Sequence, residues 1–208
     1  MQNLKVTLIQ AKLAWEDIES NLAGFDQKID GIMEETHLIV LPEMFSTGFS
    51  MNAETLAQDM GGSAVEWLRS KSRQKQVDIV GSVMIKEDEK HFNRLLWVKP
   101  EGEMFVYDKK HLFRFAGEEK VYSAGDKNII VDLHGWKISP FICYDLRFPI
   151  WTRNIANRYD VAIFIANWPE RRSLHWNALL VARAIENQCY VIGVNRVGTD
   201  GKGFSYSG

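Results

Sequence analysis

The stretch "SPFICYDLRFP", Ser139 to Pro149, joins an apolar strand to a polar turn and indicates the type of fold. Phe141 and Ile142 lead to a lone cysteine, Cys143, and a charged turn follows. A cysteine at a strand end can expose its sulfur to backbone N–H groups and a helix dipole, which favour the thiolate. Proline is common in the first turn of a helix, so we expect a short helix after Pro149. The stretch therefore predicts a strand, a turn and a helix in succession.

Patterns on both sides of this stretch predict an interleaved series of strands and helices. Continuous apolar runs predict buried strands, and apolar residues three and four apart predict helices. We expect strands within residues 4–10, 37–43, 78–85, 93–100, 104–111, 128–145 (two strands), 161–168 and 189–198. We expect helices over residues 22–32, 63–76 and 173–188, the last with Leu174, Ala178, Val181 and Ile185 on one stripe.

This order predicts one domain over residues 1–208, because neither half of the chain closes alone and no linker interrupts it. Two sheets packed face to face, with helices outside both, account for the continuous apolar strands. The last expected strand is followed by the glycine-rich tail "GFSYSG", which we expect neither to cap nor to pack against other elements. We also expect that the C-terminal strands of the domain are missing.

The composition of the 208 residues limits the class of function. A net charge of −2 gives no electrostatic basis for binding nucleic acid or an anionic membrane, and no run of 18 apolar residues predicts a membrane span. The start "MQNLKVTLIQ" lacks the features of a signal peptide. Cys143 and Cys189 lie too far apart for a CxxC pair, so we expect free thiols in a reducing cytoplasm. No zinc spacing or phosphate loop occurs, so we expect no metal or cofactor.

Three strand ends carry side chains that together suit nucleophilic catalysis. Glu43 ends "LIVLPE", Lys109 and Lys110 close "MFVYDKKH", and Cys143 ends its strand. A thiol, a base and a cation for developing negative charge are the groups that such catalysis needs. Each also has an ordinary explanation, as a core cysteine, a solvated strand end or a solvated lysine, and a histidine base stays open. Alternation along the strand lets only one of the two lysines face the site.

The amino-acid sequence around these residues resembles that of the nitrilase, or carbon–nitrogen hydrolase, superfamily, and the resemblance extends over nearly the whole chain. The matching motifs are "LPEMF" around Glu43, "YDKKHLF" around Lys109, "ICYDLRFP" around Cys143, and "ANW" and "ARAIENQ" further on. The longer stretches "LPEMFSTGFSMN", "HLFRFAGEE", "CYDLRFPIWTRN" and "NWPERRSLHW" resemble the omega-amidase branch. The resemblance implies an α+β fold, a four-layer α-β-β-α sandwich of two mixed sheets, usually dimeric through an outer helical layer.

The resemblance also implies roles for individual residues. Glu43 becomes the general base, Lys109 the oxyanion stabiliser and Cys143 the nucleophile. Glu118, seven residues before a glycine, matches a second glutamate that supports the site, and we expect the Tyr144 N–H to be an oxyanion donor. The motif, rather than the alternation, selects Lys109 over its neighbour.

The implied reaction is hydrolysis of the terminal amide of a 2-oxo-dicarboxylic acid monoamide, 2-oxoglutaramate or its methylthio analogue, to the acid and ammonia through a cysteine thioester. Such a substrate carries a carboxylate remote from its amide, which arginine can bind. The expected substrate-binding residues are Phe49, Arg147, Trp168, Arg171, Arg172 and His175. The alternatives are a nitrilase or other aliphatic amidase of the same superfamily, and a catalytically silent binding protein. We expect a homodimer that binds a small amide.

Overall fold

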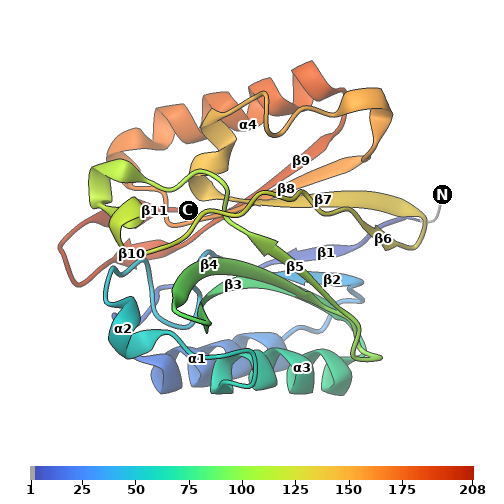
Figure 1. Ribbon diagram of the computed structural model, residues 1–208. Coiled ribbons are helices and arrows are strands. Elements are labelled where there is room, and N and C mark those ends of the chain that lie inside the picture. Colours follow the sequence, from blue (N-terminus) through green and yellow to red (C-terminus); the bar gives the residue numbers. More distant parts are fainter. Residues whose placement is uncertain (1–2) are drawn as a thin grey trace.

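Two β-sheets pack face to face in the computed structural model, which describes residues 3–208, and helices cover the outer face of each sheet (Figure 1). The first sheet has the order β1 (Val6–Leu8), β2 (Leu38–Val40), β3 (Asp78–Glu87), β4 (Lys90–Val98) and β5 (Met104–Asp108). The second has the order β6 (Val131–Leu133), β7 (Trp136–Ile142), β8 (Val161–Ala166) and β9 (Tyr190–Asn195). Both sheets contain parallel and antiparallel pairs, so the predicted four-layer sandwich of mixed sheets is confirmed.

The outer layers consist of three longer helices. The first sheet is covered by α1 (Ile18–Asp30) and α3 (Ser63–Lys75), and the second by α4 (Ser173–Asn187) (Figure 1). The shorter helical segments are α2 (Ala53–Leu56), η1 (Arg114–Ala116), η2 (Glu118–Lys120), η3 (Cys143–Arg147), η4 (Ile155–Asn157) and η5 (Glu170–Arg172). Within residues 3–208 no helix combines the length and the apolar character that crossing a membrane requires.

The main core lies between the two sheets. Val40 and Trp97 of the first sheet belong to the same fully buried cluster as Phe141 and Phe164 of the second. Burying a side chain of this size stabilises a fold by about 1.5–3 kcal/mol. The core therefore fixes the strands whose carboxyl ends carry the polar residues described below.

The connection after Cys143 differs from the prediction of a helix beginning at Pro149. The helical turn is η3, which starts at Cys143 itself and ends before the proline. The Asp145 carboxylate accepts the backbone N–H of Ile142 at 3.2 Å, and this contact closes the turn early. The residues that follow Pro149 form turns, so the predicted helix there is wrong.

The C-terminal tail also differs from the prediction, because it packs on the body of the molecule. It forms a hairpin of β10 (Val197–Thr199) and β11 (Ser205–Ser207). Tyr206 is buried, and its hydroxyl donates to Asp200 Oδ2 at 2.8 Å. A glycine-rich segment without a long apolar run can thus still contribute to a cavity wall.

The apolar stripe of α4 faces away from the sheet. Leu174, Val181 and Ile185 are 76%, 58% and 72% exposed, whereas Trp176 and Leu180 pack toward the strands. Helical spacing defined this stripe, but the spacing does not indicate which surface covers it. The stripe is accordingly an uncovered apolar surface on the outside of the chain.

Candidate active site

The carboxyl ends of four strands meet at one edge of the two sheets and surround a pocket of about 170 Å³. Glu43 follows β2, Lys109 follows β5, Cys143 follows β7 and Asn167 follows β8. All four line the pocket. Ligands of α/β sheets bind in this position, beyond the carboxyl ends of the strands.

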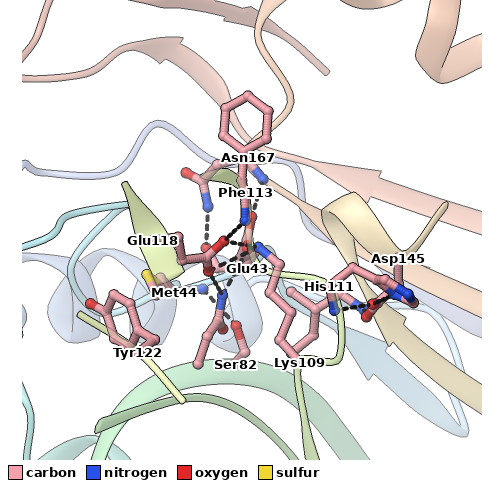
Figure 2. Close-up of polar contacts among 12 residues, drawn as sticks. Glu43, Met44, Ser82, Lys109, His111, Phe113, Glu118, Tyr122, Asp145 and Asn167 are labelled. Atoms are coloured by element: carbon pink, nitrogen blue, oxygen red, sulfur yellow. Dashed lines mark hydrogen bonds and ion pairs between the residues drawn. The ribbon is translucent and has the colours of Figure 1, made fainter. Parts of the chain in front are cut away.

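Lys109 joins two carboxylates on the floor of the pocket (Figure 2). Its Nζ donates to Glu43 Oε1 at 2.8 Å and to both oxygens of Glu118 at 3.0 Å. None of the three side chains is more than 1% exposed. Burial on its own lowers the pKa of Lys109, but the negative charges of Glu118 and Glu43 outweigh it and raise the pKa. The ammonium therefore remains protonated; we call these three residues the charge cluster.

Backbone and amide donors hold the two carboxylates in place (Figure 2). Asn93 Nδ2 donates to Glu43 Oε1 at 2.8 Å, and the Asn167 N–H donates to Glu43 Oε2 at 2.8 Å. The Phe113 N–H donates to Glu118 Oε2 at 2.5 Å. Burial raises the pKa of Glu118. Both oxygens of Glu43 are thus engaged, which fixes the orientation of its carboxylate.

The turns that present Glu43 and Cys143 share an uncommon backbone geometry. Met44, directly after Glu43, has φ 45°, and its N–H donates to Ser82 Oγ at 2.8 Å (Figure 2). Cys143 also has φ 45°. Left-handed backbone at a residue other than glycine costs free energy and concentrates at functional sites. In both turns the chain reverses abruptly after a buried strand.

The Cys143 sulfur lies in the pocket and not on the surface of the molecule. The residue is 9% exposed, and it lines the pocket together with Glu43. Burial and the negative charge of Glu43 raise the pKa of the thiol well above its usual value. The prediction of an exposed sulfur is therefore wrong, because the residue is buried within the pocket. The prediction of a thiolate favoured by a helix dipole is also wrong, because the turn that follows has only five residues. The resting thiol is protonated.

Three arginines, which we call the arginine rim, line the pocket above the charge cluster. The guanidinium groups of Arg147, Arg171 and Arg172 lie over aromatic rings, 4.9–5.1 Å from the ring centroids of Trp168, Phe204 and Phe113 respectively. Within the part of the chain that the structure describes, none of the three forms an ion pair with a carboxylate. Burial and the positive charges of the other two arginines lower the pKa of Arg172. The rim is therefore a positive surface without a matching anion.

Most of the residues predicted from the sequence are gathered in this pocket. Phe49, Tyr144, Arg147, Trp168, Arg171 and Arg172 line it together with Glu43, Lys109 and Cys143. Glu118 lies behind Lys109. His175 is not part of the lining; it contacts Arg147 Nη2 through its Nδ1 at 2.9 Å. Lys110 points elsewhere, with its ammonium 5.1 Å from the Trp151 ring.

Other residues in or behind the pocket were not predicted from the sequence. Asn167 follows β8 as Glu43 follows β2, so the strand-end argument applied to the "ANW" motif would have identified it. Asn93 lies within β4 and carries no local signal. Asp200 and Tyr206 come from the C-terminal hairpin. Among residues 3–208, no group of three or more histidine, cysteine, aspartate or glutamate side chains is arranged to hold a metal ion.

The fold and the pocket define a hydrolase of the nitrilase type, and comparison with known proteins agrees. Residues 5–208 match the carbon–nitrogen hydrolase family, and the chain belongs to this family. Its sequence is 51% identical over 210 residues to the omega-amidase YafV of Escherichia coli (strain K12), covering 100% of this chain and 80% of that protein. It is 35% identical over 199 residues to the 2-oxoglutaramate amidase of Bacillus subtilis (strain 168), covering 94% and 77%.

A solved structure supports the same relationship. A CN-hydrolase superfamily protein of Xanthomonas campestris, crystallised with an arsenic adduct in its active site, superposes with a TM-score of 0.96 at 41% identity. The superposition covers 99% of this chain and 80% of that protein. The four-layer fold described above is therefore the fold of the superfamily.

Proposed function

We propose that this enzyme is an omega-amidase that hydrolyses the terminal amide of a 2-oxo-dicarboxylic acid monoamide, such as 2-oxoglutaramate or its methylthio analogue, to the acid and ammonia. The observation that carries the proposal is the division of one pocket into a floor, formed by Cys143, Glu43 and Lys109, and the arginine rim, whose guanidinium groups form no ion pair with a carboxylate of residues 3–208. The floor suits an amide and the rim suits a distant carboxylate. The identities of 51% and 35% to an omega-amidase and a 2-oxoglutaramate amidase support this substrate class.

In the first half of the proposed reaction, Glu43 accepts the proton of the Cys143 thiol while the sulfur attacks the amide carbon. A base is necessary because the raised pKa of the thiol leaves it protonated at rest. The carbonyl oxygen becomes an oxyanion, which the Lys109 ammonium and the Tyr144 N–H stabilise. The carbon–nitrogen bond then breaks, the protonated Glu43 gives its proton to the departing nitrogen, and ammonia leaves a thioester on the sulfur.

In the second half, Glu43 takes a proton from a water molecule, whose oxygen attacks the thioester carbon. The carbon–sulfur bond breaks, the sulfur takes the proton from Glu43, and the carboxylic acid is released. The scheme needs no metal or organic cofactor. Lys109 carries a fixed positive charge through both halves, because Glu118 and Glu43 keep its pKa raised.

The arginine rim supports recognition of the substrate carboxylate. Planar guanidinium groups bind carboxylates through two parallel hydrogen bonds. We select Arg172 as the main carboxylate-binding residue, because its guanidinium lies over Phe113 and because burial and the positive charges of Arg171 and Arg147, which lower its pKa, would be offset by a bound carboxylate. Arg147 has a partner in His175, which orients it from outside the pocket.

An assay of ammonia release on a panel of amides tests the proposed function. We expect kcat/KM for 2-oxoglutaramate to exceed that for a neutral amide such as propionamide by about 10- to 100-fold, as for a charge-assisted hydrogen bond. Comparable values would contradict the substrate class, and turnover of the matching nitrile in preference to the amide would favour the nitrilase alternative. Absence of any turnover would favour a silent binding protein.

We further propose that the enzyme forms a homodimer in the cytoplasm. The exposed stripe of α4 supports a contact with a second copy, and the free cysteines support a reducing compartment. We expect Val181→Glu to produce a monomer in sedimentation analysis. Met33→Glu, a change of an exposed apolar residue beyond α1, is the control and should leave the oligomeric state unchanged. A wild-type chain that sediments as a monomer would contradict the proposal.

A further inference from the structure

One buried carboxylate outside the pocket ties together two segments that carry pocket residues. Asp145 is fully buried, and its Oδ2 accepts from the Tyr107 hydroxyl at 2.6 Å and from the Ile142 N–H at 3.2 Å. Its Oδ1 accepts from the His111 N–H at 2.9 Å and lies 2.9 Å from His111 Nδ1 (Figure 2). Because a carboxylate only accepts, Nδ1 must carry the proton in this contact. Four donors therefore converge on one side chain.

These donors belong to the segments of Lys109 and Cys143. Tyr107 and His111 lie two residues before and two residues after Lys109, and Ile142 directly precedes Cys143. The His111 ring is stacked on Phe148, with 3.7 Å between ring centroids and 6° between ring planes, and this stacking orients the ring that donates to Asp145. Asp145 thus connects the end of β5 to the turn that follows β7.

We propose that Asp145 is a positioning residue that fixes the distance and orientation between the Lys109 ammonium and the Cys143 sulfur. It does not line the pocket, so it acts through these two residues and not on the substrate. The inference rests on the proposed function, in which an oxyanion forms between that sulfur and that ammonium. Misplacing such groups by about 1 Å costs roughly 100-fold in rate.

The first test replaces Asp145 by asparagine, which presents an N–H to donors that need an acceptor. We expect Asp145→Asn to lower kcat by about 100-fold with little change in KM, since the substrate contacts are intact. The control is Asp108→Asn, which removes a carboxylate next to Lys109 that pairs with Arg94 at 2.7 Å but does not touch the Cys143 turn. The control should lose some thermal stability and keep kcat within about threefold. A folded Asp145→Asn variant with wild-type kcat would overturn the proposal.

A double-mutant cycle separates positioning from general stability. If Asp145 acts by placing Lys109, then Asp145→Asn should cost much less in kcat when Lys109 is already methionine. The cycle of Asp108→Asn with Lys109→Met should be additive. Additive losses for the Asp145 cycle would show that Asp145 acts independently of Lys109 and would overturn the proposal.

If the Asp145 variant does not fold, a pair of His111 variants tests the positioning role of Asp145 instead. Asparagine places an amide N–H where histidine has Nδ1–H, whereas leucine offers no donor. We expect His111→Leu to lower kcat about tenfold, the effect of losing one hydrogen bond to a charged group, and His111→Asn to restore it. Equal activities of the two variants would overturn the proposal.

The alkylation rate of Cys143 by iodoacetamide, followed by mass spectrometry, gives a readout that requires no amide turnover. We expect both Asp145→Asn and His111→Leu to slow alkylation, while Asp108→Asn leaves it unchanged. Unchanged alkylation in the first two variants would contradict the role of Asp145 in orienting the thiol. If the wild-type chain released no ammonia from any amide, the proposed function would fail while this measurement would still test Asp145.

Discussion

The floor and the arginine rim of the pocket differ in the groups that surround their positive charges. On the floor, Lys109 meets two carboxylates at 2.8–3.0 Å, and neighbouring amides complete their hydrogen bonds. On the rim, the guanidinium groups lie over aromatic rings and form no ion pair with a carboxylate of the described residues. The charges of the floor are thus compensated before substrate arrives, whereas those of the rim await an anion.

The largest loss should follow the removal of the thiol. Cys143→Ala should abolish turnover without unfolding the protein, and Cys143→Ser should be nearly inactive because a carboxylate activates a hydroxyl poorly. Cys189, half-buried beside β9, is the matched control, and Cys189→Ser should retain activity. Steady-state assays with circular dichroism check this. Retention of activity by Cys143→Ala together with its loss in Cys189→Ser would reverse the assignment.

The next largest effect should come from Glu43→Gln. The amide keeps the shape but cannot accept the thiol proton, so the rate should fall by roughly 10²–10⁴. Its NH₂ group would also oppose the Asn167 N–H or the Lys109 ammonium, so we expect some loss of thermal stability. Mass spectrometry of the trapped thioester provides the measurement. A variant that acylates at the wild-type rate would show that Glu43 is not the base of the first half-reaction.

Two adjacent lysines distinguish the floor from its surroundings. Lys109→Met should raise the barrier by about 3–4 kcal/mol, as the loss of an oxyanion donor does. Lys110→Met should change the rate by less than about tenfold, since its ammonium lies over Trp151 and outside the pocket. Steady-state kinetics on both variants show which lysine acts in the pocket. An inactive Lys110→Met variant beside an active Lys109→Met variant would contradict the register of this strand.

The smallest and most selective effect should arise at the rim. Arg172→Met should raise KM for 2-oxoglutaramate by about 10- to 100-fold, the effect of losing a charge-assisted hydrogen bond, and leave propionamide turnover nearly unchanged. Arg73→Met, at an exposed position of α3, should affect neither substrate. Equal losses for the charged and the neutral amide would remove the distinction between floor and rim.

The sequence predicted the floor better than its supports, for a physical reason. Carboxyl ends of strands gather at one edge, so local patterns alone predict Glu43, Cys143 and one of two adjacent lysines together, and the family motif selects Lys109. Glu118 begins a short helical turn with no such pattern, and only the family resemblance indicates it. Asn93 acts from the middle of a strand across 50 residues, and no local signal reports such a contact.

The predictions that the structure contradicts, for the helix at Pro149 and for the C-terminal tail, also have local causes. A five-residue turn such as η3 is too short to show helical spacing, so the sequence pattern wrongly predicts a helix start at Pro149. The tail "GFSYSG" has one large buried ring, Tyr206, which periodicity does not detect. The stripe of α4 was found, but the surface that covers it is not encoded in its spacing.

The buried charge cluster has a consequence for how the chain folds. Lys109 and Glu43 come together across 66 residues, and the Asn167 N–H that binds Glu43 lies 124 residues away along the chain. A partly folded chain that buried one of these charges without the others would lack several kcal/mol of compensation per ion, so such intermediates are poorly populated. The site should therefore assemble in one late, cooperative step, when both sheets have closed. Recovery of amide turnover during refolding would then report the completion of the whole fold rather than the formation of any single element.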